Sequence, residues 1–133
     1  QNYFEQYLGQ FPAQVFDKIN ENFIRCSFFE LVSRYLSMCY TFAIEQNNSE
    51  GRADFEMTGI PGTDYYTDDR LVEFKYFKAK DAEKVLASDS PLAEHVEQVH
   101  RYAKDTLRRF PNYHVRTYVV YICANRGWKC WEV

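Results

Sequence analysis

A short apolar run that carries two opposite charges restricts the fold of this chain more than any other feature. Residues 70–78 read RLVEFKYFK, a run rich in the apolar and aromatic side chains that favour a strand. Glu73 and Lys75 lie in its middle, two residues apart, so in a strand both side chains leave the same face. A buried charge is costly unless it is paired or binds an ion. The run therefore predicts a strand whose charged side chains have a specific partner.

An acidic residue on the preceding expected strand completes the pattern. Residues 51–58 read GRADFEMT, in which polar side chains alternate with apolar ones, and a Gly-Ile-Pro-Gly run ends the segment. Hard cations such as Mg²⁺ are bound through carboxylates and keep several water ligands. A nearby lysine can orient or deprotonate the attacking water and stabilise charge in the transition state. Asp54 on one strand and Glu73-x-Lys75 on the next thus favour a divalent metal site beside a scissile phosphate.

Each part of this pattern also has a simpler interpretation. Glu73 and Lys75 can form a salt bridge on a strand that faces water, and Asp54 fits the polar face of a half-exposed strand. The order and placement of the three residues favour the metal site. The simpler alternatives stay open at the level of sequence.

The rest of the chain predicts one α/β domain over residues 1–133, with residues 1–21 as an N-terminal helical extension. One helix is expected over residues 22–38, capped by Asn20 or Asn22, and another begins after a cap at Ser90 and ends near Arg109. The expected strands cover residues 40–46, 51–58, 70–78, 114–124 and 128–133, with a loop or short helix at 79–90. This order predicts a mixed central sheet flanked by helices.

Two polar residues on the later helix are further candidates. Gln98 and Tyr102 are four residues apart and therefore project together. We expect them beside, not within, the apolar stripe of that helix, which is formed by Leu92, Val96, Val99, Ala103 and Leu107. They belong either to an ordinary polar flank or to a pair that reaches the metal site or the substrate backbone.

Charge and composition limit the classes of function. The net charge is −3, which is unusual for a non-specific nucleic-acid binder, but basic residues gather in two stretches, 75–84 and 101–109. Hydrophobic residues make up 46% of the chain, which excludes a disordered protein. No apolar stretch approaches the ~18 residues of a membrane span, and no signal peptide is visible. We therefore expect a cytoplasmic protein with no membrane contact.

Cysteine usage and the first residue add two expectations. The four cysteines form no C-x-x-C pair and no zinc spacing, so we expect reduced, buried thiols, with a Cys123–Cys130 bridge as the alternative. Because the sequence begins with Gln1 and not with methionine, we expect it to be a piece of a longer protein.

Taken together, these motifs resemble those of the PD-(D/E)XK nuclease superfamily. The resemblance rests on Gly51-Arg52-Ala53-Asp54, on Glu73-Phe74-Lys75, and on Gln98-x-x-x-Tyr102, which is similar to a motif of RecB-type nucleases. It covers residues 23–133, and Ala53 replaces the proline of the family name. The most similar group is the small nuclease-like domain at the C-terminus of bacterial proteins with an AAA-ATPase-like region. The resemblance implies a restriction-endonuclease-like fold with an αβββαβ core.

The resemblance also implies roles for individual residues. Asp54 and Glu73 would be ligands of Mg²⁺ or Mn²⁺, with the Phe74 carbonyl as a further one, and Lys75 would be the catalytic lysine. Gln98 and Tyr102 would support the site. Many relatives use a glutamate on the first core helix, for which Glu30 is the candidate here; its alternative is a solvated helix residue.

Three functions follow from these expectations. The first is a metal-dependent nuclease that acts on DNA in preference to RNA. The second is a catalytically inactive module of the same fold, which docks or binds nucleic acid for an ATPase-like domain of the full-length chain. The third is an interaction domain whose aromatic N-terminal residues, Tyr3, Phe4, Tyr7 and Phe11, pack on a partner or on a second copy in a homodimer.

Overall fold

The structure is a computed structural model that describes residues 6, 7, 9–44 and 54–133 of the chain. Its elements, in order, are η1 (Ala13–Asp17), α2 (Glu21–Leu36), β1 (Tyr40–Ile44), β2 (Phe55–Gly59), β3 (Asp68–Phe77), η2 (Ala79–Asp81), α3 (Ala82–Leu86), α4 (Ala93–Arg109), β4 (His114–Cys123) and β5 (Gly127–Glu132). The predicted order of helix, three strands, helix and two strands is confirmed.

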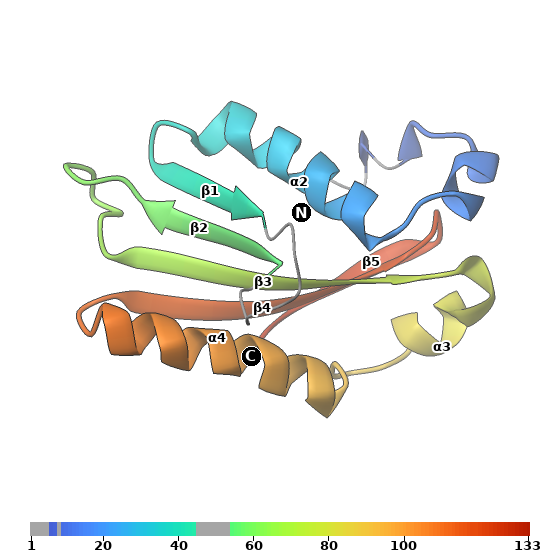
Figure 1. Ribbon diagram of the computed structural model, residues 1–133. Coiled ribbons are helices and arrows are strands. Elements are labelled where there is room, and N and C mark those ends of the chain that lie inside the picture. The colour runs from blue at the N-terminus through green and yellow to red at the C-terminus, as the bar shows by residue number, and fades with distance from the viewer. Residues whose placement is uncertain (1–5, 8, 45–53) are drawn as a thin grey trace.

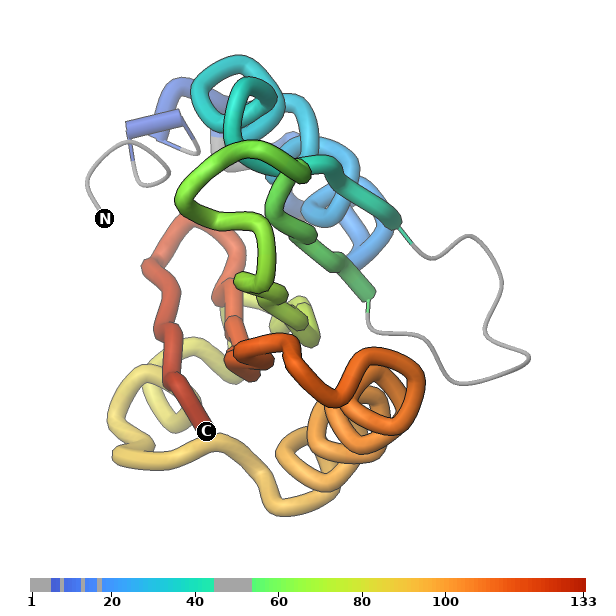
Figure 2. Tube along the Cα trace, turned by 90° about the vertical axis from the view of Figure 1, so that its left-hand side faces the viewer, coloured from blue at the N-terminus to red at the C-terminus, as the bar shows by residue number. Residues whose placement is uncertain are grey.

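The five strands form one mixed sheet in the spatial order β1-β2-β3-β4-β5. Strands β3 and β4 run parallel, and every other neighbouring pair is antiparallel. A parallel pair needs a long crossover connection, which α4 supplies here. Helices α2 and α4 lie on opposite sides of the sheet (Figures 1 and 2). This is the mixed, helix-flanked sheet that the sequence predicts.

Alternation along β3 divides its side chains between two cores. Val72 and Phe74 belong to the core under α2, whereas Leu71 packs with Val99 of α4. Because side chains alternate along a strand, Glu73 and Lys75 leave the same face as Leu71. Strand β2 begins opposite Val72, so among the described strands only β4 pairs with the last part of β3.

The ends and faces of the helices differ from the predictions in two places. Asn20 caps α2, its Oδ1 accepting from Phe23 N at 3.0 Å, as one of the two predicted caps. Ser90 does not cap α4: Leu92 occupies the cap position without a side-chain cap, and its N–H donates to the Tyr121 hydroxyl at 2.8 Å. The predicted stripe of α4 is also rotated, since Tyr102 is buried and Leu107 is exposed.

The thiols are free, but they are not all buried. Cys123 is buried and Cys39 is half-buried, whereas Cys26 and Cys130 are exposed, which corrects the expectation of four buried thiols. No bridge joins Cys123 to Cys130. Cys130 lies opposite Val120, three residues from Cys123, so the two thiols leave opposite faces of the β4–β5 pair.

None of the helices within residues 6, 7, 9–44 and 54–133 has the length and apolar character that crossing a membrane requires.

Candidate active site

Glu73 is the most unusual residue of the sheet. Its side chain is fully buried, and neither carboxylate oxygen accepts a hydrogen bond from any described residue. Lys75 Nζ lies 2.9 Å from Glu73 Oε1, an ion pair outside hydrogen-bond geometry. The Lys75 side chain is 21% exposed, so it connects the buried acid with solvent. A pair on a water-facing strand, the simpler interpretation of the sequence, does not describe this arrangement.

Asp54 is hydrogen-bonded to the backbone of β3 at Phe74, the residue between Glu73 and Lys75. The Phe74 N–H donates to Asp54 Oδ2 at 3.0 Å, and Arg25 Nη1 of α2 donates to Asp54 Oδ1 at 2.7 Å. Asp54 directly precedes Phe55, whose partner in the β2–β3 register is Val72, and its charge acts on Glu73. The fold therefore brings Asp54, Glu73 and Lys75 together at the start of β2.

The electrostatics of the three residues are coupled. Burial raises the pKa of Glu73, the charge of Asp54 raises it further, and the ion pair with Lys75 opposes both effects, so that the pKa is about 7. Burial lowers the pKa of Lys75, but the charges of Glu73, Glu21 and Asp54 outweigh burial, and the net pKa is raised. Lys75 is therefore an ammonium ion at neutral pH and can donate hydrogen bonds and stabilise negative charge.

Two further side chains that the sequence did not indicate interact electrostatically with residues of this site. Glu21, the first residue of α2, contributes negative charge that raises the pKa of both Glu73 and Lys75. His95 of α4 has a pKa lowered by burial and by the positive charge of Lys75, so it is neutral at pH 7. Its Nδ1 forms a hydrogen bond with the hydroxyl of Tyr121, which lies beside Lys75 in the β3–β4 register.

These two residues give only ordinary signals in the sequence. An acidic residue after an asparagine cap is expected at any helix N-terminus, where it interacts with the helix dipole. A single histidine in the first turn of an amphipathic helix has no distinguishing spacing.

The other predicted residues lie elsewhere. Glu30 is on the exposed side of α2, where its carboxylate pairs with Arg34, and the helix glutamate that acts on Glu73 is Glu21. Gln98 Nε2 donates to the Tyr102 hydroxyl at 3.1 Å. Tyr102 is 9% exposed and packs in the core between α4 and the sheet, not beside the apolar stripe as predicted. The two residues project together, on the helix that covers the face of Glu73, and their supporting role stays a prediction.

The donor set fits a magnesium-like ion better than a transition metal. Within the described ranges, no group of three or more His, Cys, Asp or Glu side chains is arranged to hold a metal. Mg²⁺ needs only one or two carboxylates, because waters and substrate phosphates complete its coordination. Asp54 and Glu73 supply two carboxylates, and the Phe74 carbonyl is a third candidate oxygen. Glu73 Oε2, which is buried and has no partner among the described residues, is the atom that a cation would satisfy.

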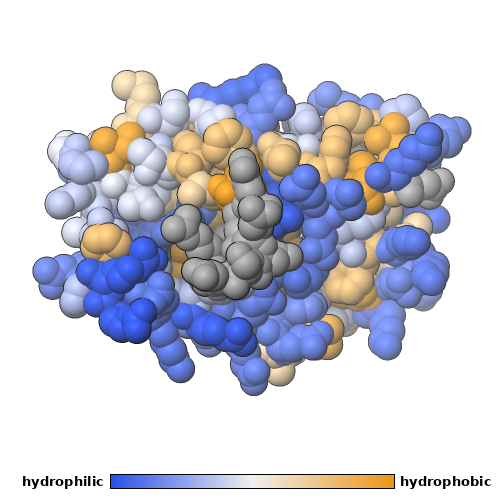
Figure 3. Space-filling view, viewed as in Figure 1, coloured by the Kyte–Doolittle hydropathy of each residue, from blue (hydrophilic) through white to orange (hydrophobic). Residues whose placement is uncertain are grey.

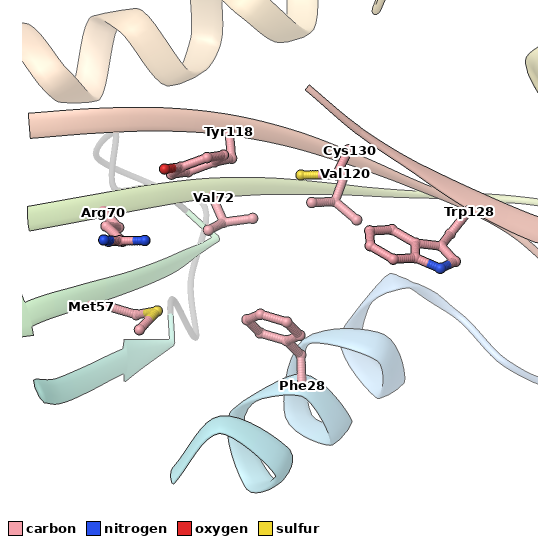
Figure 4. A pocket seen from close by; sticks show the side chains of 8 residues that line it. All are labelled: Phe28, Met57, Arg70, Val72, Tyr118, Val120, Trp128 and Cys130. Carbon is pink, nitrogen blue, oxygen red and sulfur yellow. The ribbon is translucent and has the colours of Figure 1, made fainter. Parts of the chain in front are cut away.

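A separate pocket of about 230 Å³ lies on the other face of the sheet, under α2 (Figure 4). Its lining residues are Phe28, Met57, Arg70, Val72, Tyr118, Val120, Trp128 and Cys130. Arg70 pairs with Asp68, their Nε and Oδ2 atoms 2.9 Å apart, so its charge is already matched. Because Val72 and Val120 face away from Glu73 and Lys75, this pocket is not part of the carboxylate site.

A family model described as the PD-(D/E)XK nuclease superfamily matches residues 19–132. No curated protein and no solved structure matches the chain.

Proposed function

The chain belongs to the PD-(D/E)XK nuclease superfamily, and we propose that it is a metal-dependent nuclease that hydrolyses phosphodiester bonds of DNA in preference to RNA. The observation that carries this proposal is Glu73. A fully buried carboxylate is costly unless it is paired or binds a cation, and Lys75 pairs with Oε1 while Oε2 has no partner among the described residues. The position of Glu73 beside Asp54 supports its role as a cation ligand.

The residues of the site divide the chemistry between them. Asp54 and Glu73 would hold Mg²⁺ or Mn²⁺, with the Phe74 carbonyl as a further oxygen. Such an ion, when bound, supplies Lewis acidity at a phosphate oxygen and lowers the pKa of bound water. Lys75, held as an ammonium ion by its acidic neighbours, orients the attacking water and stabilises the negative charge that develops on the phosphate. Gln98 and Tyr102, which are hydrogen-bonded to each other on α4, would support the site.

Local positive charge supports nucleic acid as the partner. Arg101, Lys104, Arg108 and Arg109 are exposed on α4. In Figure 3, strongly hydrophilic side chains gather at the lower left, over the C-terminal half of α4. Phosphate contacts by lysine and arginine give affinity without sequence preference. The acidic net charge of the whole chain restricts this binding to the basic side of the molecule.

We also propose a RecB-like subtype for this domain and an ATPase-like domain in the same full-length chain. The Gln98-x-x-x-Tyr102 motif supports the subtype, and the similarity to C-terminal domains of bacterial proteins supports the ATPase-like domain. The four free thiols support a cytoplasmic setting. We further propose that a second copy of the chain is a partner, in a homodimer.

One observation favours the alternative function, a catalytically inactive module for docking or nucleic-acid binding. Arg25 already places a positive charge on Asp54. In a protein that has lost catalysis, an arginine can replace the metal and keep a buried aspartate neutralised.

Cleavage assays separate the two functions. The purified protein is incubated with single-stranded DNA, double-stranded DNA and RNA in Mn²⁺ or Mg²⁺, beside Glu73→Gln and the matched surface variant Glu83→Gln. We expect DNA cleavage that needs the metal, is lost in Glu73→Gln and is unchanged in Glu83→Gln. Cleavage that is equal in all three proteins is contamination and would favour the inactive module.

A further inference from the structure

Arg25 is a charged residue at this site that the proposed reaction does not use. It lies on the second turn of α2, and its Nη1 is 2.7 Å from Asp54 Oδ1. The two side chains are only 14% and 9% exposed, so solvent screens their attraction weakly. Arg25 Nε is buried and has no hydrogen-bond partner among the described residues. The guanidinium therefore contacts the aspartate through one nitrogen, not through the two-nitrogen fork that makes such pairs strongest.

Both oxygens of Asp54 are engaged, and only one of these contacts can be released easily. The Phe74 N–H that bonds Oδ2 belongs to the backbone of β3, which the sheet fixes. The Arg25 contact with Oδ1 comes from a long side chain that can adopt another rotamer. A cation that binds Asp54 through Oδ1 therefore meets Arg25 first.

The local charges make Arg25 and a divalent cation unfavourable neighbours. Asp54, Glu73 and Glu21 supply the negative charges of the site, and Arg25 and Lys75 supply the positive charges. Adding a divalent cation leaves an excess of positive charge in a poorly hydrated region.

We propose that Arg25 is a positioning residue that competes with the divalent cation for Asp54, holding the aspartate in the metal-free protein and weakening cation binding until the guanidinium is released. The inference rests on the proposed function only in that it requires the cation site.

A purely structural role for Arg25 predicts the opposite sign. If the arginine merely held Asp54 in the orientation that the cation needs, removing the arginine would disorder the aspartate and weaken cation binding. If the arginine competes, removing its charge strengthens cation binding. The direction of the change therefore decides between the two roles.

The test is a calorimetric titration with MnCl₂, without nucleic acid, on the wild-type protein and on Arg25→Gln, Arg25→Lys and Arg34→Gln. Arg34 is a matched control, because it is an arginine of the same helix that pairs with a glutamate on the exposed side. We expect Arg25→Gln to bind Mn²⁺ about 10- to 100-fold more tightly, the range of a charge-assisted hydrogen bond. Arg34→Gln should match the wild type. Equal or weaker binding by Arg25→Gln overturns the proposal.

Arg25→Lys keeps the test decisive if Arg25→Gln does not fold, which circular dichroism reports. Lysine is a better hydrated point charge without a planar fork, so it releases Asp54 more readily than arginine. The affinity of Arg25→Lys should lie between those of the wild type and Arg25→Gln. An affinity at or below that of the wild type overturns the proposal.

The outcomes also separate this inference from the proposed nuclease function. Binding that is equal in the wild type and Arg25→Gln rejects the competition and leaves the nuclease in place. Binding by Arg25→Gln alone upholds the competition and contradicts catalysis by the natural chain. No binding by either protein rejects both.

Discussion

At the scale of single residues, the sheet contains a second buried acid that has no place in the proposed reaction. Asp69 is fully buried, its Oδ1 accepts a hydrogen bond from Thr58 Oγ1 at 3.1 Å, and its Oδ2 has no partner in the described part of the chain. Burial and the negative charge of Glu56 raise its pKa to about 7. Asp69 therefore keeps its proton in the folded protein at pH values where the unfolded chain has lost it.

This difference predicts how stability depends on pH. The folded pKa lies above the unfolded value, so the contribution of Asp69 is most favourable below about pH 4 and is lost as the pH rises towards 7. The slope is at most about 1.4 kcal/mol per pH unit. An asparagine does not titrate, so Asp69→Asn does not lose this contribution as the pH rises. The free energy of unfolding of Asp69→Asn, relative to that of the wild type, should therefore rise between pH 5 and pH 8. Urea denaturation at both values measures this, and a constant difference would contradict the assignment.

A matched pair of glutamates on α2 tests which of them serves the cation site. Glu21 acts electrostatically on Glu73 and Lys75, whereas Glu30 pairs with Arg34 on the exposed side. We expect Glu21→Gln to weaken Mn²⁺ binding about three- to tenfold, because a nearby negative charge is lost. Glu30→Gln should leave binding unchanged. Calorimetric titration of the two variants gives the comparison, and a larger loss in Glu30→Gln would restore the residue indicated by the family resemblance.

At the scale of elements, the start of α4 is held by a side chain of β4. The Tyr121 hydroxyl accepts from Leu92 N and bonds His95, and so performs the task expected of a capping side chain. Tyr121→Phe leaves both groups without this partner and should lower the free energy of unfolding by about 1–2 kcal/mol. Hydrogen exchange in the first turn of α4 should rise as well. Tyr113→Phe, which changes a half-exposed tyrosine, is the control, and equal effects in both variants would contradict a capping role for Tyr121.

The elements also show what a sequence pattern can predict. The run around Glu73 predicts β3 because strand preference and alternation are local properties. The order of Asp54, Glu73 and Lys75 along the chain predicts that the three residues lie close together, and their roles in catalysis stay a prediction. The sequence pattern places Tyr102 beside the apolar stripe of α4, whereas it is buried, because the buried face depends on which strands the helix crosses. Composition favours Ser90 as the cap, but Tyr121 reaches the helix start from 29 residues away along the chain.

Long-range convergence explains the residues that the sequence did not indicate. Glu21, His95 and Arg25 reach the site from two helices on opposite faces of the sheet, and no spacing along the chain encodes that meeting. A family resemblance directs attention to Glu30, which lies about two and a half turns after Glu21 on the same helix.

At the scale of the whole molecule, the site lies near the N-terminal ends of the two long helices, α2 and α4. The N-terminal ends of α2 and α4 lie at the end of the sheet where β3 finishes (Figure 1). Helix N-termini carry partial positive charge and free N–H groups, which suit a phosphate. Lys75 lies in the last part of β3 and is affected by Glu21 of α2, while it in turn affects His95 of α4. This arrangement supports an anionic substrate bound across the end of the sheet.

The most direct measurement is anomalous diffraction from crystals of the protein grown or soaked in MnCl₂. The account predicts a manganese peak between the carboxylates of Asp54 and Glu73, with Arg25 displaced from Asp54 Oδ1 and no peak in crystals of Glu73→Gln. A peak bound elsewhere, or no peak beside these two carboxylates in the wild-type protein, would contradict it.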